Sequence, residues 1–517
     1  MFENLKRKID YALKGEGRQP PQDEKDPLRS TVDDNMLLLR QKFPDSLDLN
    51  TREMAFGKTK IALLTCEGLV NAETLAISVI GPLSRLARQP GMCKEKLVDF
   101  IMHKSILSPE QKEFFDFDAL FKALMSGFAV LLIDGESRGF AFGVQGYKYR
   151  SIDDATNETN ELGPKEAFVE PIRVNLSMVR RRIKSPNLQF ELMTLGAQSK
   201  TDVCLVYMND RTSTSLLREI RLKLQKVNLD IILDSSYLRP YLENHPFALF
   251  SSVGTTERPD IVCGKIAEGR VAVLVDGSPF ALILPFLFSE NFKSFDDYAH
   301  RPYFSTFVRL LKYFSFYLSF LLPGAYVAIT TFHPELLPHE LLFSIAASEE
   351  IIPFSLMVEA LFIYLVFEIM REAGIRLPSA VGHTIGIVGA LVIGDAAVNA
   401  GLIGAPMVMV VAITAICAFS VPQLYEPIMI LRFAFIIIGG YAGLFGIALG
   451  AVTVSALICS MNSMHIPVTA PLSPLDQKWL GDSILFGGIR RLSGRRLKIQ
   501  NINGSEIPDR EGLKRND

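Results

Sequence analysis

Charge is distributed very unevenly along this chain of 517 residues, and that distribution limits its fold more than any motif does. Between Phe304 and His465, 14 of 162 residues are Asp, Glu, Lys or Arg, about 9%, whereas the other 355 residues carry 96 of them, about 27%. Soluble domains contain about 25% charged residues. The chain is therefore expected to place a region over residues 301–465 in lipid, between regions that fold in water.

Five stretches of this region are mostly apolar over about 20 residues, the length that crosses a hydrocarbon core of about 30 Å as a helix. The last stretch carries no charge and is too long for one upright crossing. It is predicted to form two short spans, broken near Gly439-Gly440 or Gly446, or one span with a re-entrant piece. The region thus predicts an all-α polytopic membrane domain of five to six helices. The stretches are Tyr313–Phe332, Ile351–Met370, Ala380–Ile403, Pro406–Leu424 and Phe433–Met461.

Lys and Arg residues indicate which side of the membrane each short connection faces, because they concentrate in cytoplasmic loops. They occur before the first stretch, after the second, at Arg432 and in the basic segment Arg490–Lys498. Residues 333–350 contain glutamates but no Lys or Arg. Both termini are therefore predicted to be cytoplasmic, which requires an even number of crossings: six, or four plus a hairpin.

The first 300 residues alternate short apolar runs with amphipathic stretches, a pattern typical of an α/β or α+β fold. Ala129–Ile133 and Phe140–Val144 flank the turn signal Asp134-Gly135, and Ile231–Leu233 is a further strand candidate. The N-terminus has no apolar core behind its charges, so no secretory signal is predicted. The expected parts are a polar, loosely ordered lead-in (1–56), two cytoplasmic subdomains (57–188 and 189–300), the membrane domain (301–465) and a basic cytoplasmic tail (466–517).

Nothing in the sequence predicts an enzyme. No H-E-x-x-H, nucleophile elbow or G-x-G-x-x-G pattern occurs, and the seven histidines do not cluster at metal-ligand spacing. Gly57-Lys58-Thr59 resembles the end of a phosphate-binding loop, but Arg52 stands where that loop needs a glycine. The six cysteines include no C-x-x-C pair, which favours reduced thiols. No catalytic site, cofactor or metal is predicted, and the net charge of −2 does not indicate nucleic acid binding.

Polar groups inside the apolar stretches are the sharpest functional signal. A charge at the bilayer centre costs at least about 2.5–3.5 kcal/mol, and Glu359 lies nine residues into its predicted span, close to mid-depth. Asp395 and Asn399 are four residues apart and share one helical face. Such groups either serve a polar pathway or a proton, or lock helices together through buried hydrogen bonds, and the sequence leaves both interpretations open.

Small residues and one proline add candidates to this set. Gly382 and Gly386 have the G-x-x-x-G spacing that lets helices approach closely, which fits tight packing as well as a glycine-lined pore. Pro323 removes a backbone hydrogen bond inside the first stretch and is expected to kink it. The candidate pore or coupling residues are therefore Glu359, Asp395, Asn399, Pro323 and Gly386.

A series of short sequence motifs resembles the A subunit of the GerA-type spore germination receptors of endospore-forming bacteria. The resemblance runs from about residue 57 to residue 490, with mild departures at Lys165 and Ala167. No single motif is specific, but the series is. The motifs include Gly163-Pro-Lys-Glu-Ala-Phe-Val-Glu170, Thr256-Glu-Arg-Pro-Asp260, Glu268-Gly-Arg-Val-Ala-Val-Leu-Val-Asp-Gly-Ser-Pro-Phe280, Phe295-Asp-Asp-Tyr298, Leu322-Pro-Gly-Ala-Tyr326 and His333-Pro-Glu335.

The resemblance implies a two-part cytoplasmic region on a membrane domain in the spore inner membrane. It implies two partners, a transporter-like B subunit that binds the nutrient and a lipoprotein C subunit, and a homo-oligomer that forms a nutrient-gated ion pathway in contact with lipid. The main hypothesis is therefore a germinant-receptor subunit. The alternatives are a secondary transporter that uses Glu359 or Asp395 as proton carrier, and an accessory scaffold without a pore, like the related protein encoded with the dipicolinic acid channel.

Overall fold

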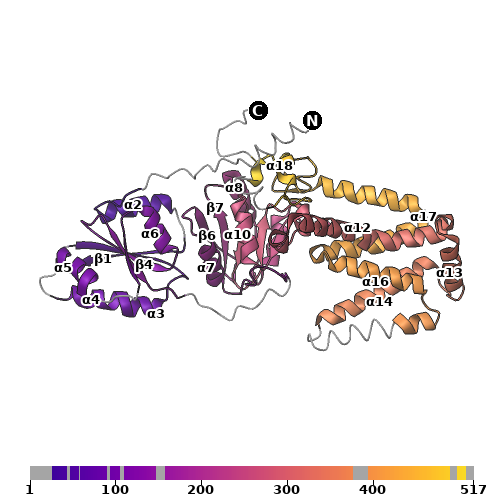
Figure 1. Ribbon diagram of the computed structural model, residues 1–517, viewed down its shortest axis with the longest axis horizontal. Coiled ribbons are helices and arrows are strands. Elements are labelled where there is room, and N and C mark those ends of the chain that lie inside the picture. The colour runs from indigo at the N-terminus through magenta and orange to yellow at the C-terminus, as the bar shows by residue number, and fades with distance from the viewer. Residues whose placement is uncertain are drawn as a thin grey trace. The chain divides into compact units, whose positions relative to one another are not determined.

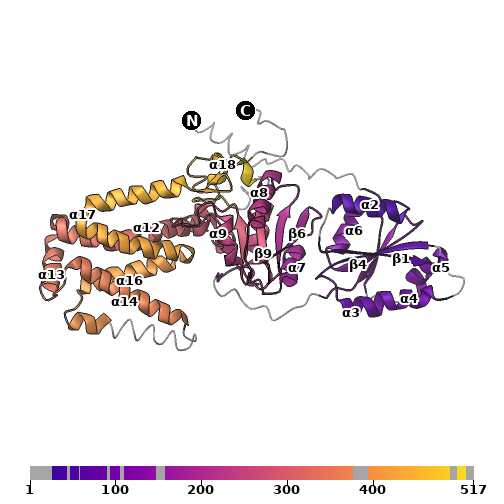
Figure 2. The same cartoon turned by 180° about the vertical axis from the view of Figure 1, so that it is seen from behind.

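The computed structural model describes residues 26–43, 47–57, 59–89, 93–104, 110–146, 158–376, 394–488 and 498–507 (Figures 1 and 2). The chain forms two compact units, one of residues 1–150 with 176–190 and one of residues 151–175 with 191–517. The chain has two five-stranded sheets, and the second unit also holds the long apolar helices. The mixed α/β character predicted for the N-terminal region is confirmed.

The first sheet has the strand order β1-β2-β4-β5-β3, with antiparallel pairing throughout. Successive residues of a strand face opposite sides, so Ala62 and Leu64 join the core under α2 and α6, and Ile61 and Leu63 join the core under α3–α5. The elements are α2 (Val32–Lys42), β1 (Leu49–Phe56), β2 (Thr59–Cys66), α3 (Ala72–Leu75), the π-helical η1 (Ala76–Ile80), α4 (Gly81–Ala87), α5 (Lys94–Asp99), the π-helical η2 (Phe100–Lys104), β3 (Gln111–Phe114), α6 (Phe117–Leu124), β4 (Phe128–Ile133) and β5 (Gly139–Gly143).

The second sheet has the order β6-β7-β9-β10-β8, and β9 is buried along its whole length because it lies at the centre. The elements are α7 (Ile172–Arg182), β6 (Leu188–Leu195), β7 (Thr201–Met208), α8 (Thr214–Gln225), η3 (Ser235–Tyr237), α9 (Arg239–Leu242), β8 (Gly254–Thr256), α10 (Pro259–Ala267), β9 (Val271–Val275), β10 (Ala281–Leu284), η4 (Phe288–Phe292) and α11 (Asp296–Ala299).

The two sheets are copies of one module, because the second order equals the first when five is added to every strand number. The turn after the central strand repeats as well. Asp134 follows β4 and accepts a hydrogen bond from the amide of Val32, the first residue of α2, at 3.1 Å. Asp276 follows β9 and accepts one from the amide of Ile172, the first residue of α7, at 2.9 Å. A carboxylate at a helix N-terminus satisfies a free amide and complements the helix dipole.

A second repeated contact closes the loop in front of each helix. Asn35 of α2 accepts from the amide of Arg29 and donates to its carbonyl, and Asn175 of α7 makes the same two bonds with Val169. Both asparagines are buried. Each module is thus held by the same pair of side chains, one after the central strand and one inside the first helix.

Replacing Asn175 by leucine is expected to lower the free energy of unfolding by about 1–3 kcal/mol, because it leaves the amide and carbonyl of Val169 without their partner. Asn35→Leu is the matched change in the first module and should cost a similar amount. Urea unfolding of the two variants checks both values. An Asn175→Leu variant as stable as the parent chain would show that the two hydrogen bonds between Asn175 and Val169 contribute nothing to stability.

Part of the predicted lead-in is folded. It contains α2, in keeping with one short helix expected there, and also β1, which was not expected. β1 gives no strand signal in the sequence because it lies at the sheet edge with four exposed residues in a row. The strand predicted at Ile231–Leu233 is also absent. Ile232 joins the core, but its two neighbours are exposed, in an irregular segment before η3.

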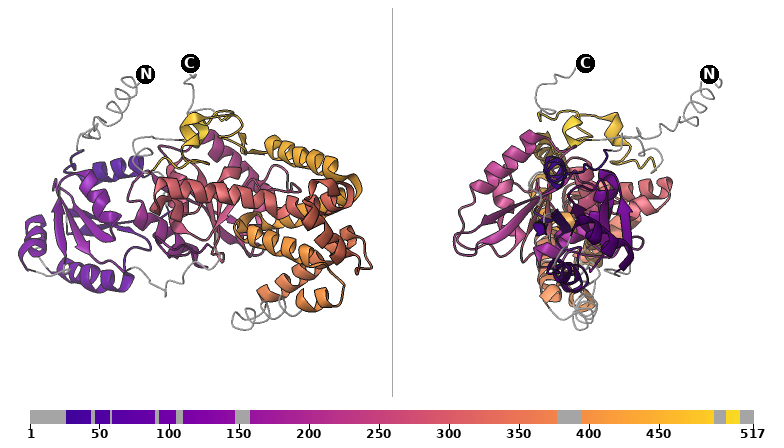
Figure 3. Two further views of the ribbon diagram at one scale, coloured as in Figure 1. Left: turned by 45° about the vertical axis from the view of Figure 1, so that its right-hand side comes forward. Right: turned by 90° about the vertical axis from the view of Figure 1, so that its left-hand side faces the viewer.

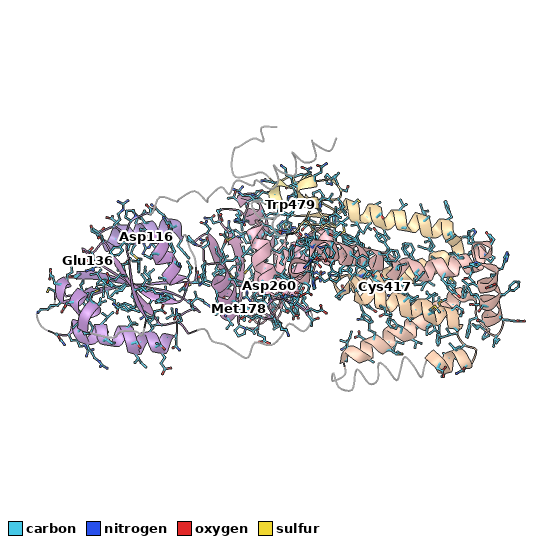
Figure 4. All side chains as sticks on the ribbon, viewed as in Figure 1. Asp116, Glu136, Met178, Asp260, Cys417 and Trp479 are labelled. Atoms are coloured by element: carbon cyan, nitrogen blue, oxygen red, sulfur yellow. The ribbon has the colours of Figure 1, made fainter. Side chains whose placement is uncertain are left out.

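The C-terminal segment, expected to be a basic tail, contributes apolar residues to a core. Trp479, which Figure 4 labels, joins the core beside α8 together with Ile499 and Ile502. Because these apolar residues stand far apart among polar ones, they show no periodicity. The elements here are β11 (Asn462–Ser463), β12 (Ile466–Pro467), α18 (Gln477–Leu480) and η7 (Ile499–Asn501).

Residues 302–460, which we call the helical half, contain α12 (Pro302–Phe332), η5 (Pro334–Leu336), α13 (His339–Glu349), α14 (Leu356–Arg376), α16 (Ala405–Phe419), η6 (Pro422–Leu424) and α17 (Tyr425–Ser460). Among the described residues, 302–332 and 422–460 form the two helices long and apolar enough to cross a membrane, and α16 is a shorter apolar helix. Much of the third predicted span lies outside the described residues. Five to six membrane helices therefore stays a prediction.

Helix α17 is broken at Gly443, whose φ of 59° and ψ of −154° are not helical. The break lies between the two glycine sites named from the sequence. The two arms fold back on each other, since a β-carbon on Gly450 would stand 3.0 Å from the ring of Phe435. Each arm is about 26 Å long at 1.5 Å per residue. α12 runs from the second sheet into the helical half (Figure 3).

Candidate functional site in the helical half

Glu359 lies in the first turn of α14, because the helix begins at Leu356, five residues after the start of the predicted span Ile351–Met370. Residues 350–355 connect the end of α13 to Leu356, where α14 begins. The side chain is 1% exposed, and its Oε1 accepts a hydrogen bond of 2.7 Å from the amide of Gly404, the N-cap of α16. The carboxylate is thus placed between the starts of two helices.

Four polar side-chain atoms at this place are buried without a hydrogen-bond partner among the described residues: Oε2 of Glu359, Oε1 of Glu349 and the hydroxyls of Tyr326 and Thr330. They come from α14, α13 and α12. A β-carbon on Gly404 would stand 3.5 Å from Oε1 of Glu359 and 3.6 Å from Oε1 of Glu349, so both carboxyl groups border one small space. Tyr326 interacts electrostatically with both. Buried polar atoms are normally paired, and these four are not.

Asp395 and Asn399 do not join this cluster. Residues 394–399 are helical, as expected, and both side chains are exposed, whereas Glu359 is buried. The predicted residues therefore do not form one site. Gly386 lies outside the described residues.

Pro323 is buried inside α12, which continues as a helix on both sides of it. The next residue, Gly324, shows why this part of α12 is buried: it lies against α17. A β-carbon on Gly324 would overlap the carbonyl of Phe435, and one on Gly439 would overlap the carbonyl of Gly324. α12 and the first arm of α17 thus touch backbone to backbone, which only glycine permits.

A buried arginine joins three helices at the opposite end of α14. Arg432 of α17 is fully buried, pairs with Glu368 at 3.2 Å and donates to the carbonyl of Ser319 in α12 at 3.0 Å. Tyr425 donates to the same glutamate, and the guanidinium of Arg371 lies 3.7 Å from the Tyr425 ring. The sequence placed Arg432 on the cytoplasmic side but did not indicate its partner.

A second buried arginine connects the start of α12 to the C-terminal segment. Arg309 is fully buried and pairs with Asp297 at 2.7 Å and Asp482 at 3.3 Å. The hydroxyl of Tyr298 donates to Asp482 at 3.0 Å. Burial alone would raise the pKa of Asp482, but Lys293 and Arg309 lower it below its ordinary value.

The network continues into the second sheet through Glu290. This carboxylate receives two hydrogen bonds from the buried guanidinium of Arg270, at 2.6 and 2.9 Å, and pairs with Lys265 at 2.5 Å. Burial opposes ionisation, but Arg270 and Lys265 outweigh it and lower the pKa of Glu290 to about 2. Arg270, Asp297 and Tyr298 belong to two motifs of the family resemblance, so these two motifs contribute to one buried ionic junction.

Acid is expected to weaken this junction. Because the pKa of folded Glu290 is about 2 and its ordinary value is 4.5, its contribution is complete above 4.5 and is lost as the pH falls toward 2. Thermal unfolding at about pH 7 and pH 3 should show a fall in Tm for the parent chain. The fall should be smaller for Glu290→Gln, which has no charge to lose. An identical fall in both would contradict the assignment.

A cavity of about 430 Å³ lies beside the junction, between α10 and the start of η6. Gly264 of α10 opens toward free space, since a β-carbon there would meet nothing within 4 Å. The lining includes Ile283, Phe286, Gln423 and Asp482. No pattern in the sequence predicted this cavity.

The geometry defines a class of protein with two repeated α/β modules. The second module is joined through a buried ionic junction to a set of helices, and two of these helices have the length and polarity of membrane spans. The family model of the Bacillus/Clostridium GerA spore germination protein matches residues 38–496. The chain belongs to the GerA family.

Individual relatives support this family assignment. The chain is 38% identical to spore germination protein KA of Bacillus subtilis, covering 87% of this chain and 83% of that protein. It is 35% identical to spore germination protein B1 of the same organism, over 89% and 95%, and 33% identical to spore germination protein GerLA of Bacillus cereus, over 86% and 91%. A crystal structure of the N-terminal domain of the A subunit of the Bacillus megaterium germinant receptor GerK3 matches at 29% identity, covering 51% of this chain and 98% of that one, with a TM-score of 0.41.

Proposed function

We propose that this chain is the A-type subunit of a nutrient germinant receptor in the spore inner membrane, and that its helical half forms an oligomeric ion pathway. Membership of the GerA family and the germination proteins among its relatives support the role in germination. The partners are a transporter-like B subunit and a lipoprotein C subunit. Within this proposal the chain signals and conducts, and it carries out no chemistry.

The observation that carries the ion pathway is the exposure of Asp395 and Asn399. Both lie on one face of a helix, and the helix that follows, α16, is apolar. A charge facing lipid near the bilayer centre costs at least about 2.5–3.5 kcal/mol. A ring of subunits removes this cost by turning the face toward a wet lumen.

The membrane topology of the proposal is multi-pass with both ends cytoplasmic. Gly443 supports it, because it turns α17 back so that the chain leaves the helical half at the end where α17 begins. Ser463, just after α17, donates to the carbonyl of Ser252 in the α/β module. Cysteine labelling from each side of sealed vesicles tests this arrangement.

Deleting the gene should abolish germination with at least one nutrient and leave spore formation intact. Normal responses to every nutrient in the deletion strain would reject the receptor role.

For the pathway itself, Asp395→Ala should lower cation flux through vesicles containing the purified chain by about tenfold, because the lumen loses its charge. Glu340→Ala, which removes an exposed glutamate of α13, is the matched control and should leave flux unchanged. Equal flux in the parent and Asp395→Ala would remove Asp395 from conduction. Solute uptake by the chain alone would instead favour a transporter.

A further inference from the structure

The unpaired polar atoms around Glu359 form a set with a single chemical character. Each is an oxygen: two from carboxyl groups and two from hydroxyl groups. Among the described residues, no three His, Cys, Asp or Glu side chains gather as a metal cluster, so a zinc-type site is not formed here. Carboxylate and hydroxyl oxygens are the ligands of hard cations such as Ca²⁺ and Mg²⁺.

Because Glu359 is buried, its carboxylate needs a positive counter-charge. Glu359 is 1% exposed, and the hydrogen bond that it accepts from the amide of Gly404 reaches only Oε1. Its Oε2 has no partner among the described residues, and neither has Oε1 of Glu349. A buried carboxylate is stable only when it is paired, coordinated to a metal or protonated. Within the part of the chain that the structure describes, neither carboxyl group forms an ion pair with an arginine or lysine; the neighbouring charge that acts on Glu349 is Glu359.

The space between the two carboxyl groups is defined by Gly404. Both Oε1 atoms lie at ordinary contact distance from the point where its β-carbon would stand. Glu349 is only half-buried, so it also gives the space a route to solvent. A metal site needs oxygen ligands, a second shell that holds them and an entry path, and the hydrogen bond from Gly404 supplies the second shell.

We infer that Glu349, Glu359, Tyr326 and Thr330 form a binding site for a hard divalent cation within one subunit. Two carboxylates carry two negative charges, so a divalent ion balances them, and water from the Glu349 side completes its coordination. The cation joins α12, α13 and α14 to the start of α16, which the hydrogen bond to Gly404 already holds. This site is separate from the lumen proposed at Asp395, although its place in a membrane protein rests on the proposed function.

The test uses the detergent-purified full-length chain, stripped with EDTA and followed by thermal unfolding. Tm should rise with added Ca²⁺ or Mg²⁺ at constant ionic strength. Loss of even an outer partner of a metal ligand costs about 10- to 100-fold in affinity, so Glu359→Gln should weaken the apparent affinity by at least about tenfold. Glu349→Gln should do the same. Glu350→Gln removes the exposed neighbouring glutamate and should leave the titration unchanged.

A steric variant keeps both carboxyl groups. Gly404→Ala places a methyl group in the space at ordinary contact distance, and the residue has φ −73° and ψ 140°, which alanine adopts freely. This variant should remain folded and bind the cation more weakly than the parent chain.

Three outcomes would overturn the inference. One is a Tm that does not respond to Ca²⁺ or Mg²⁺. Another is a response that the glutamine variants retain. The third is a Tm that rises only when the pH is lowered, which would show that the two carboxyl groups share a proton. None of these touches germination or flux, so the site can fail while the proposed function stands, and the reverse also holds.

Discussion

An Arg309→Met variant is expected to lose about 3–5 kcal/mol of unfolding free energy, because it leaves buried Asp297 without its cation and leaves Asp482 with Lys293 alone. Asp297 is 2% exposed and Asp482 is also largely buried, and Arg309 is the arginine that contacts both. Methionine has a similar length, so the loss of packing is small. Urea or thermal unfolding of the purified chain measures the change.

Two further measurements separate charge from packing in this prediction. Arg301→Met, at the exposed N-cap of α12, should change stability by less than about 0.5 kcal/mol. The penalty of Arg309→Met should shrink at acid pH, because the two carboxylates can then take up protons. A penalty that is the same at about pH 7 and pH 4 would show that packing, rather than charge, carries the effect.

The same arginine shows where sequence reasoning stops. Arg309 served as an orientation signal, because cations near an apolar stretch mark the cytoplasmic side. Its partner Asp482 is 173 residues away in the chain. Arg432 and Glu368 are 64 residues apart. Periodicity reports which residues share a face of one helix, but it carries no information on which distant charges meet, so both junctions were missed.

The turns that repeat in the two α/β modules can be recognised in the sequence. Asp134-Gly135 was identified as a turn signal after an apolar run, and Asp276-Gly277 follows the apolar run of β9 in the same way. The structure places each turn beside the first helix of its module. Two of the edge strands, β1 and β8, were missed for a physical reason. β1 buries almost nothing and β8 has three residues, so neither gives the alternation by which a strand is recognised.

For the candidate site, the sequence selected Glu359 correctly as an unusual charge but could not supply its surroundings. Glu349 and Tyr326 stand in separate elements, and Gly404 contributes a backbone amide, which no side-chain pattern reveals. Asp395 and Asn399 share a face as predicted from their spacing, and the structure adds that this face is exposed.

Alanine at Gly324 or at Gly439 is expected to cost more than about 3 kcal/mol, the upper end of the range for overpacking. The added methyl group would overlap a backbone carbonyl of the facing helix, and a backbone, unlike a side chain, cannot move to another rotamer. α12 and α17 would have to separate along their contact. The expected result is a lower yield of folded protein and a lower Tm in detergent.

Gly374 and Gly264 supply controls of opposite sign for this prediction. Both lie inside helices, and a β-carbon on either would meet nothing within 4 Å. Alanine there should stabilise the chain by about 0.5–1 kcal/mol, since glycine is the poorer helix former. Replacing glycine by alanine should therefore lower Tm at Gly324 and Gly439 and raise it at Gly264 and Gly374. If all four variants moved Tm in the same direction, the backbone contact between α12 and α17 would not be what these glycines provide.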